Sequence, residues 1–187
     1  EGNREKRLDA ARWLEIAHYA CSKNLSSDKI VSSYNKSFLA YPSYYLTWRD
    51  YSEWIIKSKA PLNEHRKFVE SCLHKLKSYR EPLWDLLSPY FSRVSKELGN
   101  EALAEELERL MPLLRQCEEK IREEGAFGKI LASWMRPLEK NASLKERVLT
   151  ASLKAQYGTR DYFTQVITSF SDSLMADVKM FDRIAKV

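Results

Sequence analysis

The sequence contains little that interrupts a helix. Among its 187 residues are five glycines and six prolines, and stretches that alternate Val or Thr with polar residues, as a half-buried strand would, are almost missing. No apolar run approaches the roughly 20 residues that a membrane-spanning helix needs. Charged residues, by contrast, make up 30% of the chain. The composition therefore predicts an all-α protein of ordinary domain size, with no membrane among its partners.

Cysteine and excess charge of one sign are also scarce. The three cysteines, Cys21, Cys72 and Cys117, are odd in number and widely spaced, which favours reduced thiols in an intracellular compartment. Three N-x-Ser/Thr triplets keep secretion as an alternative, and a targeting segment removed before Glu1 would leave no trace. The net charge of +5 is spread over both signs. A general nucleic-acid binder is therefore not indicated, and any RNA contact is expected to be indirect.

Groups of residues that indicate catalysis are not found. His18 and Cys21 lie one helical turn apart, and Cys72 is close to His74, but neither pair supplies the three or four ligands that zinc requires. The sequence has no Gly-rich phosphate loop, no nucleophile elbow and no paired-carboxylate motif above the general density of charge. We therefore expect a protein that is not an enzyme and that holds no metal or cofactor.

Chain-breaking and capping residues divide the first half of the chain into five expected amphipathic helices. Pro42 ends the second helix because proline disfavours the helical conformation of the residue before it. The apolar faces are expected to include Leu8 on the first helix and Leu39 on the second. The first helix is expected over about residues 4–22 and the third within Tyr41–Lys57. N-caps are expected at Ser26–Asp28 and Asn63, and the fifth helix is expected to begin at Glu81–Pro82.

Tryptophan recurs at a regular spacing. Trp13, Trp48 and Trp84 lie 35 and 36 residues apart, each on the expected second helix of a helix pair. A fixed period in this range indicates a helical solenoid, in which the rings form a wedge between stacked helices. The alternative is a base-stacking platform for single-stranded nucleic acid. It is disfavoured because Asp50 and Glu53 interrupt the basic side chains that such platforms carry.

One segment matches a known repeat pattern. The stretch SDKIVSSYNKSFLAYPSYYLTWRDYSEW resembles a HAT (half-a-TPR) repeat, with an aromatic residue in its first helix and a proline at the turn. Its second helix carries a tryptophan, a tyrosine three residues later and then an acidic residue. The matching positions are Tyr34, Pro42, Trp48, Tyr51 and Glu53.

Two further segments resemble the same repeat less closely. HRKFVESCLHKLKSYREPLWDLLSPYF is similar to a second copy, although Leu87 stands where a tyrosine is usual and the proline between the helices is missing. ARWLEIAHYA is similar to the second helix of a preceding copy. The repeat positions in these two segments are Trp13, Phe68, Leu73, Trp84 and Phe91.

The resemblance covers about residues 8 to 95. It implies antiparallel helix pairs stacked as a short HAT/TPR-like solenoid over residues 1–98. The second half departs from the pattern, since Trp134 lies 50 residues beyond Trp84. Residues 99–187 are expected to form divergent repeats or a C-terminal helical cap packed on the first half, because the last repeat of a solenoid would otherwise expose its apolar face. The helices expected there cover about residues 101–124, 143–156 and 159–187. The apolar face of the first of them is expected to carry Leu103, Leu107, Leu110, Leu114, Cys117 and Ile121.

The function that the resemblance implies is that of a non-catalytic scaffold. HAT repeats are characteristic of nuclear RNA-processing complexes, and PSYYLTWRDYSEWIIKSK most closely resembles the amino-terminal HAT domain of the large HAT subunit of cleavage stimulation factor. FLAYPSYYLTW also resembles HAT scaffolds of spliceosomal particles. A nuclear location follows, with protein subunits of a 3′-end processing or splicing complex as partners and a homodimer as a further option. The expected partner surface consists of Arg49, Asp50 and Trp54.

Two other functions stay open. The α-subunits of protein prenyltransferases also use helix pairs with a Tyr-x-x-Trp element and keep an arginine shortly after the tryptophan. Arg49 follows Trp48 in this way, whereas Asp85 follows Trp84. The chain is alternatively a helical binding module of unrelated origin whose tryptophan period is coincidental.

Overall fold

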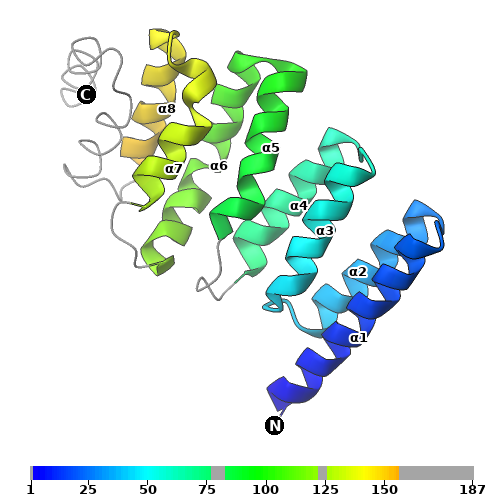
Figure 1. Ribbon diagram of the computed structural model, residues 1–187. Coiled ribbons are helices and arrows are strands. Elements are labelled where there is room, and N and C mark those ends of the chain that lie inside the picture. The colour runs from blue at the N-terminus through cyan, green and yellow to red at the C-terminus, as the bar shows by residue number, and fades with distance from the viewer. Residues whose placement is uncertain (1, 77–82, 122–125, 156–187) are drawn as a thin grey trace. The chain divides into compact units, whose positions relative to one another are not determined.

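The computed structural model describes residues 2–76, 83–121 and 126–155. Within these ranges it contains eight α-helices, one 3₁₀ helix and no strand, so the predicted all-α fold is confirmed (Figure 1). The helix expected over residues 159–187 lies outside the described residues. The helices are α1 (Gly2–Ser22), α2 (Ser27–Ala40), α3 (Tyr45–Lys57), α4 (Leu62–Lys75), α5 (Leu83–Leu98), α6 (Asn100–Ile121), α7 (Ala126–Trp134), η1 (Arg136–Leu138) and α8 (Ala142–Lys154).

The chain divides into two compact units, Glu1–Leu86 and Leu87–Val187. In the first unit, α1 to α4 lie side by side in sequence order, and each packs on the next (Figure 1). In the second unit, α6 packs on α8, and η1 contacts α6, α7 and α8. Helices packed in sequential pairs are thus a property of the structure. The expected division of the chain after residue 98 stays a prediction. None of the described helices is both long and apolar enough to span a membrane.

α1 packs on α2 through small side chains. Its buried residues are Ala10, Leu14, Ala17 and Ala20. Alanines let the two backbones come close, and the Ser37 hydroxyl on α2 donates a hydrogen bond to the carbonyl oxygen of Ala10 at 2.7 Å. The expectation that Leu8 belongs to the apolar face is wrong, since its side chain is 49% exposed. The helix is rotated so that a stripe of three alanines and Leu14 is buried, whereas Leu8 stays exposed.

The turn between α2 and α3 forms where proline predicted it. α2 ends at Ala40, and Tyr41 has extended backbone angles, with φ −154° and ψ 94°. Ser26 occupies the N-cap position of α2, as expected, but its side chain makes no capping hydrogen bond. Pro42 therefore ends this helix through its effect on the preceding residue.

The start of α4 differs from the sequence-based expectation. α4 begins at Leu62 after Pro61, so the expected cap at Asn63 is wrong. Lys59 has a left-handed φ of +53°, which turns the chain after α3. The carbonyl oxygen of Pro61 then accepts a hydrogen bond from the Glu64 amide at 2.9 Å. The proline ring fixes its own φ near the helical value, and this starts the helix without a side-chain cap.

The second unit has an apolar core built on α6. The expected stripe of this helix is buried over its described side chains, namely Leu103, Leu107, Leu110, Leu114 and Cys117. α8 begins at Ala142, where the Asn141 side-chain oxygen accepts a hydrogen bond from the Leu144 amide at 3.1 Å. This capping bond satisfies one of the free amides of the first turn.

Trp134 is part of that core. It ends α7, and the centre of its ring system lies 4.5 Å from that of Phe91 on α5. Its indole N–H donates a hydrogen bond to the Ser88 hydroxyl at 2.8 Å. From the sequence, Trp134 was only an interruption of the tryptophan period, because nothing local links it to a partner 46 residues earlier.

Candidate protein-binding groove

Trp48 on α3 forms the centre of an aromatic cluster in the first unit. Its side chain is 1% exposed. The Phe38 ring from α2 stacks on it with a centroid distance of 4.1 Å, and the Phe68 ring from α4 lies 5.9 Å away. One tryptophan therefore contacts aromatic rings from the helices on both sides of its own. Burial of this much ring area contributes strongly to core stability.

Pro42 and Trp48 are joined by a hydrogen bond. The indole N–H of Trp48 donates to the carbonyl oxygen of Pro42 at 2.6 Å. A buried N–H without a partner would cost about 1–3 kcal/mol, so this bond makes a buried tryptophan tolerable at the site. The turn that ends α2 thus also supplies the acceptor for the ring on α3. Both residues belong to the repeat positions that the sequence singled out.

A second group of rings continues the cluster toward the end of α3. Tyr34 lies 4.9 Å from Tyr51, and Trp54 stacks on Tyr51 at 5.8 Å with an angle of 7° between the ring planes. Burial raises the pKa of Tyr51 to about 12, with a smaller contribution from the negative charge of Glu64. The pKa of Tyr34 is also raised, mainly because burial removes the phenol from water and next because Cys21 lies nearby. Both phenols are therefore held in their neutral form.

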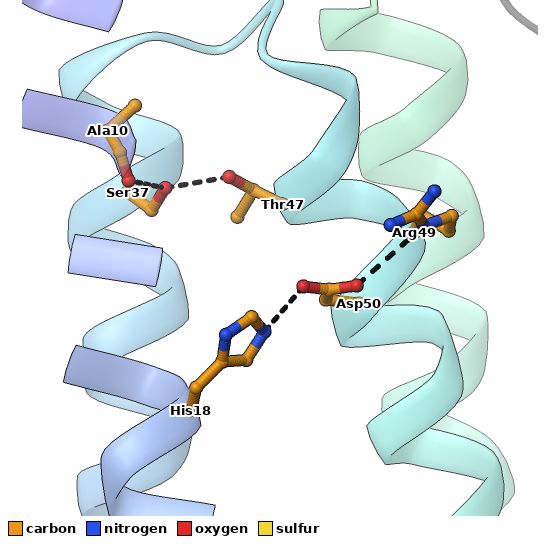
Figure 2. Close-up of polar contacts among 6 residues, drawn as sticks. All are labelled: Ala10, His18, Ser37, Thr47, Arg49 and Asp50. Atoms are coloured by element: carbon orange, nitrogen blue, oxygen red, sulfur yellow. Dashed lines mark hydrogen bonds and ion pairs between the residues drawn. The ribbon is translucent and has the colours of Figure 1, made fainter. Parts of the chain in front are cut away.

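Buried hydroxyl groups tie the first three helices together (Figure 2). Ser37 on α2 is hydrogen-bonded to Thr47 on α3, with 2.7 Å between their oxygens, and donates to the Ala10 carbonyl on α1. The side chains of Ser37 and Thr47 are fully buried. A hydrogen-bonded pair of this kind fixes the register of three helices, because a shift of any one would leave a buried hydroxyl without a partner.

Asp50, one of the expected partner-surface residues, links two helices. Its carboxylate lies 2.5 Å from Nε2 of His18 on α1 and 3.7 Å from Nε of Arg49 (Figure 2). The Asp50 side chain is 13% exposed and that of His18 is 56% exposed. In the sequence, His18 stood out only beside Cys21, as one of a pair of possible metal ligands. The contact between His18 and Asp50 could not be predicted because the two residues are 32 positions apart.

The tryptophans of the expected period occupy different environments. Trp48 and Trp84 are buried, whereas Trp13 is partly exposed and Lys36 Nζ lies 4.5 Å from the centre of its ring system. The neighbouring Leu14 takes the buried position on α1. Among the remaining repeat positions, Phe68, Leu73 and Phe91 are buried and Glu53 is exposed.

A groove runs beside the aromatic cluster, between α2 and α4. It consists of two adjoining hollows of about 760 Å³ and 730 Å³. Both hollows are lined by Val31, Asn35, Leu39 and Glu64. The hollow of about 760 Å³ is also lined by Trp48 and Tyr51 of α3. We name it the α2–α4 groove; its other lining residues are Ser27, Asp28, Ser32, Lys36, Phe38, Pro42, Trp54, Ser58, Lys59, Ala60, Pro61, Lys67, Phe68, Ser71, His74 and Lys75.

The walls of the α2–α4 groove combine apolar and charged side chains. Leu39 was expected in the core, but it is 80% exposed at the α2 wall. It lies at the end of α2, where the chain turns toward Pro42 and no following helical turn covers it. Trp54 of the expected partner surface lines the same groove. Arg49 is exposed and is not among the lining residues.

No candidate metal centre occurs in the part of the chain that the structure describes: no three His, Cys, Asp or Glu side chains there are grouped so that they could hold an ion. Cys72 is buried, and burial raises the pKa of the partly exposed Cys21 thiol. A thiol in that state is a poor nucleophile at neutral pH. The α2–α4 groove, which both apolar and charged side chains line, is the candidate binding site of the first unit.

The chain was compared with models of protein families, with curated proteins and with solved structures, and no match was found in any of the three.

Proposed function

We propose that this chain is a non-catalytic helical-repeat scaffold that binds other proteins within a nuclear pre-mRNA processing complex, in 3′-end cleavage and polyadenylation or in splicing. The observation that carries the scaffold part is the α2–α4 groove beside a buried aromatic cluster. Its volume and its mixed apolar and polar lining suit a segment of a partner protein. The choice of a nuclear complex rests on the HAT resemblance of the residues around Trp48.

The arrangement of the repeat positions supports the same proposal. Tyr34, Pro42, Trp48 and Tyr51 come from different places in the resemblance pattern, and they meet in or beside one cluster. In the proposed architecture, the helix pairs continue as a short solenoid that residues beyond 98 close with a cap. Such arrays present an extended surface of neighbouring helices to their partners.

The proposal is tested by purification of the tagged chain from nuclear extract, with and without nuclease, followed by identification of the proteins that co-purify. Nuclease-resistant recovery of polyadenylation or splicing factors would support the scaffold and name its complex. Recovery of a prenyltransferase β-subunit, or of no nuclear protein, would overturn it. A mock purification from extract without the tagged chain serves as the control for nonspecific capture.

A further inference from the structure

We propose that the α2–α4 groove binds an acidic peptide segment of a partner protein, one that places a large apolar side chain between acidic residues. This inference rests on the proposed scaffold function and specifies what its binding surface takes. It is carried by three observations on the groove: the balance of charge along its walls, an exposed apolar side chain that lines both hollows, and an exposed amide that also lines both.

The charge of the groove favours an acidic ligand. Four lysines line it, against two carboxylates, and the lysines are Lys36, Lys59, Lys67 and Lys75. Of the carboxylates, Glu64 lies 3.6 Å from the Lys67 ammonium and so is already paired. Among the described residues, the side chains of Lys59 and Lys75 make no hydrogen bond or ion pair. Complementary charge of this kind raises the association rate and selects the partner.

The middle of the groove offers an apolar contact. Leu39 is 80% exposed, and it lines both hollows together with Val31. Phe38 and Phe68 close the inner side. A large apolar side chain seated here would cover Leu39 and remove apolar surface from water, which contributes roughly 25 cal/mol for each Å² that is buried.

Asn35 suits the main chain of a peptide. It lines both hollows, is exposed, and makes no side-chain hydrogen bond within the described residues. Its amide both donates and accepts hydrogen bonds, as does each peptide unit of a bound segment. Asn35 is one turn of α2 away from Leu39, so a segment seated against Leu39 passes it.

RNA is the competing acidic ligand, and the rings argue against it. Base stacking needs an open ring face, but Phe38 covers Trp48 at 4.1 Å and Trp54 covers Tyr51 at 5.8 Å. A peptide that places an apolar side chain between acidic residues does not depend on stacking.

The test selects peptides from a random phage-displayed library on the immobilised full chain, with the Lys67→Glu/Lys75→Glu variant for counter-selection. We expect the enriched peptides to carry net negative charge and at least one large apolar residue. Enrichment of neutral or basic peptides, or of none beyond those that the variant also retains, would overturn the inference.

Binding of an enriched, fluorescein-labelled peptide is then measured by anisotropy. Lys67→Glu/Lys75→Glu is expected to weaken binding about tenfold or more. High salt is expected to weaken binding by the wild-type chain as well, but by less than this. Leu39→Asn is expected to weaken it severalfold, whereas Leu98→Asn, at a comparably exposed leucine of the second unit, leaves it unchanged. Melting curves verify that each variant is folded. Labelled oligo(U) that binds more tightly than the peptide and depends on the same lysines would assign the groove to RNA instead.

The two proposals fail in different ways. If wild type and the Lys67→Glu/Lys75→Glu variant recover the same nuclear factors and neither enriches acidic peptides, the scaffold stands and the groove inference is wrong. If acidic peptides bind in a groove-dependent manner but no nuclear protein co-purifies, the groove inference stands and the nuclear assignment is wrong.

Discussion

Two buried tryptophans, one in each unit, hydrogen-bond their indole N–H groups to different kinds of acceptor. Trp48 in the first unit donates its indole N–H to the backbone carbonyl of Pro42, six residues earlier. Trp134 in the second unit donates to the side-chain hydroxyl of Ser88, 46 residues earlier. The first arrangement is local and uses the main chain of a turn. The second requires α5 and α7 to have packed before the acceptor is in place.

The difference shows how robust each core is to mutation. A backbone acceptor is present whatever side chain the position carries, so substitution at Pro42 cannot remove it. A side-chain acceptor depends on the residue type, so substitution at Ser88 can. The first unit therefore has its vulnerable point in the ring of Trp48, and the second unit has an additional one in the partner of Trp134.

The strongest test of this comparison removes the rings. Trp48→Ala is expected to lower the free energy of unfolding by about 3–5 kcal/mol, because it empties a site between three helices. Trp84→Ala, at a second buried repeat position, is expected to cost a similar amount. Urea denaturation measures both, with Leu98→Ala as a control on an exposed side chain. Unchanged midpoints with loss of peptide binding would show that the rings form a recognition surface instead of a core.

Alkaline pH tests the burial of the Tyr51 phenol without removal of a ring from the aromatic cluster. The pKa of Tyr51 is about 12 in the folded chain and about 10 when unfolded, so the stability from its neutral phenol is complete below about pH 10. Between about pH 10 and 12 the unfolded chain releases this proton and the folded chain keeps it, and the free energy of unfolding falls by roughly 2–3 kcal/mol.

Tyr51→Phe is expected to remove this part of the pH dependence, because the variant has no proton to release. Urea denaturation between pH 9 and about 12 measures the effect in both proteins. Parallel curves for wild type and variant would contradict the burial of the phenol.

Substitution of each acceptor residue in turn distinguishes the backbone acceptor of Trp48 from the side-chain acceptor of Trp134. Ser88→Ala leaves the buried indole N–H of Trp134 without its partner and is expected to cost about 1–3 kcal/mol. Pro42→Ala keeps the carbonyl that Trp48 uses and is expected to cost less, about 1 kcal/mol, from the greater freedom of the unfolded chain. A larger loss for Pro42→Ala than for Ser88→Ala would reverse the comparison.

The smallest expected effect concerns the contact between α1 and α3. A double-mutant cycle of His18→Ala and Asp50→Ala is expected to give a coupling of about 0.2–1 kcal/mol, since the histidine is more than half exposed. The coupling should decrease in high salt. A value that does not respond to salt would indicate that a hydrogen bond from a neutral imidazole, and not an ion pair, joins the two helices.

Prediction from sequence succeeded where the signal was local. The helical fold, the stop at Pro42 and the buried stripe of α6 follow from chain-breaking residues and from apolar residues at helical spacing, both of which act within a few positions. The cap at Asn63 was wrong because Pro61 starts α4 two residues earlier through its fixed backbone angle. A side-chain cap was the usual signal there, and the proline outweighed it.

Prediction failed where one helix face had to be chosen over another. Leu8 and Leu39 are exposed although both are apolar and correctly spaced, because neighbouring helices cover the alanine stripe of α1 and the Phe38 side of α2. The groove was missed for the same reason. Its walls come from α2 and α4, and no pattern in either helix shows that their exposed sides face a common space.

The sequence by itself determined the helices, their main turns and the aromatic residues of the first core, because periodicity and proline geometry act over short distances. Only the tertiary structure decided which tryptophans are buried, that Asp50 meets His18, that Ser88 accepts from Trp134 and that Leu39 and Asn35 line a groove. These depend on which helices pack and how each is rotated. That choice is made by the fit of many side chains together and cannot be read from any one segment.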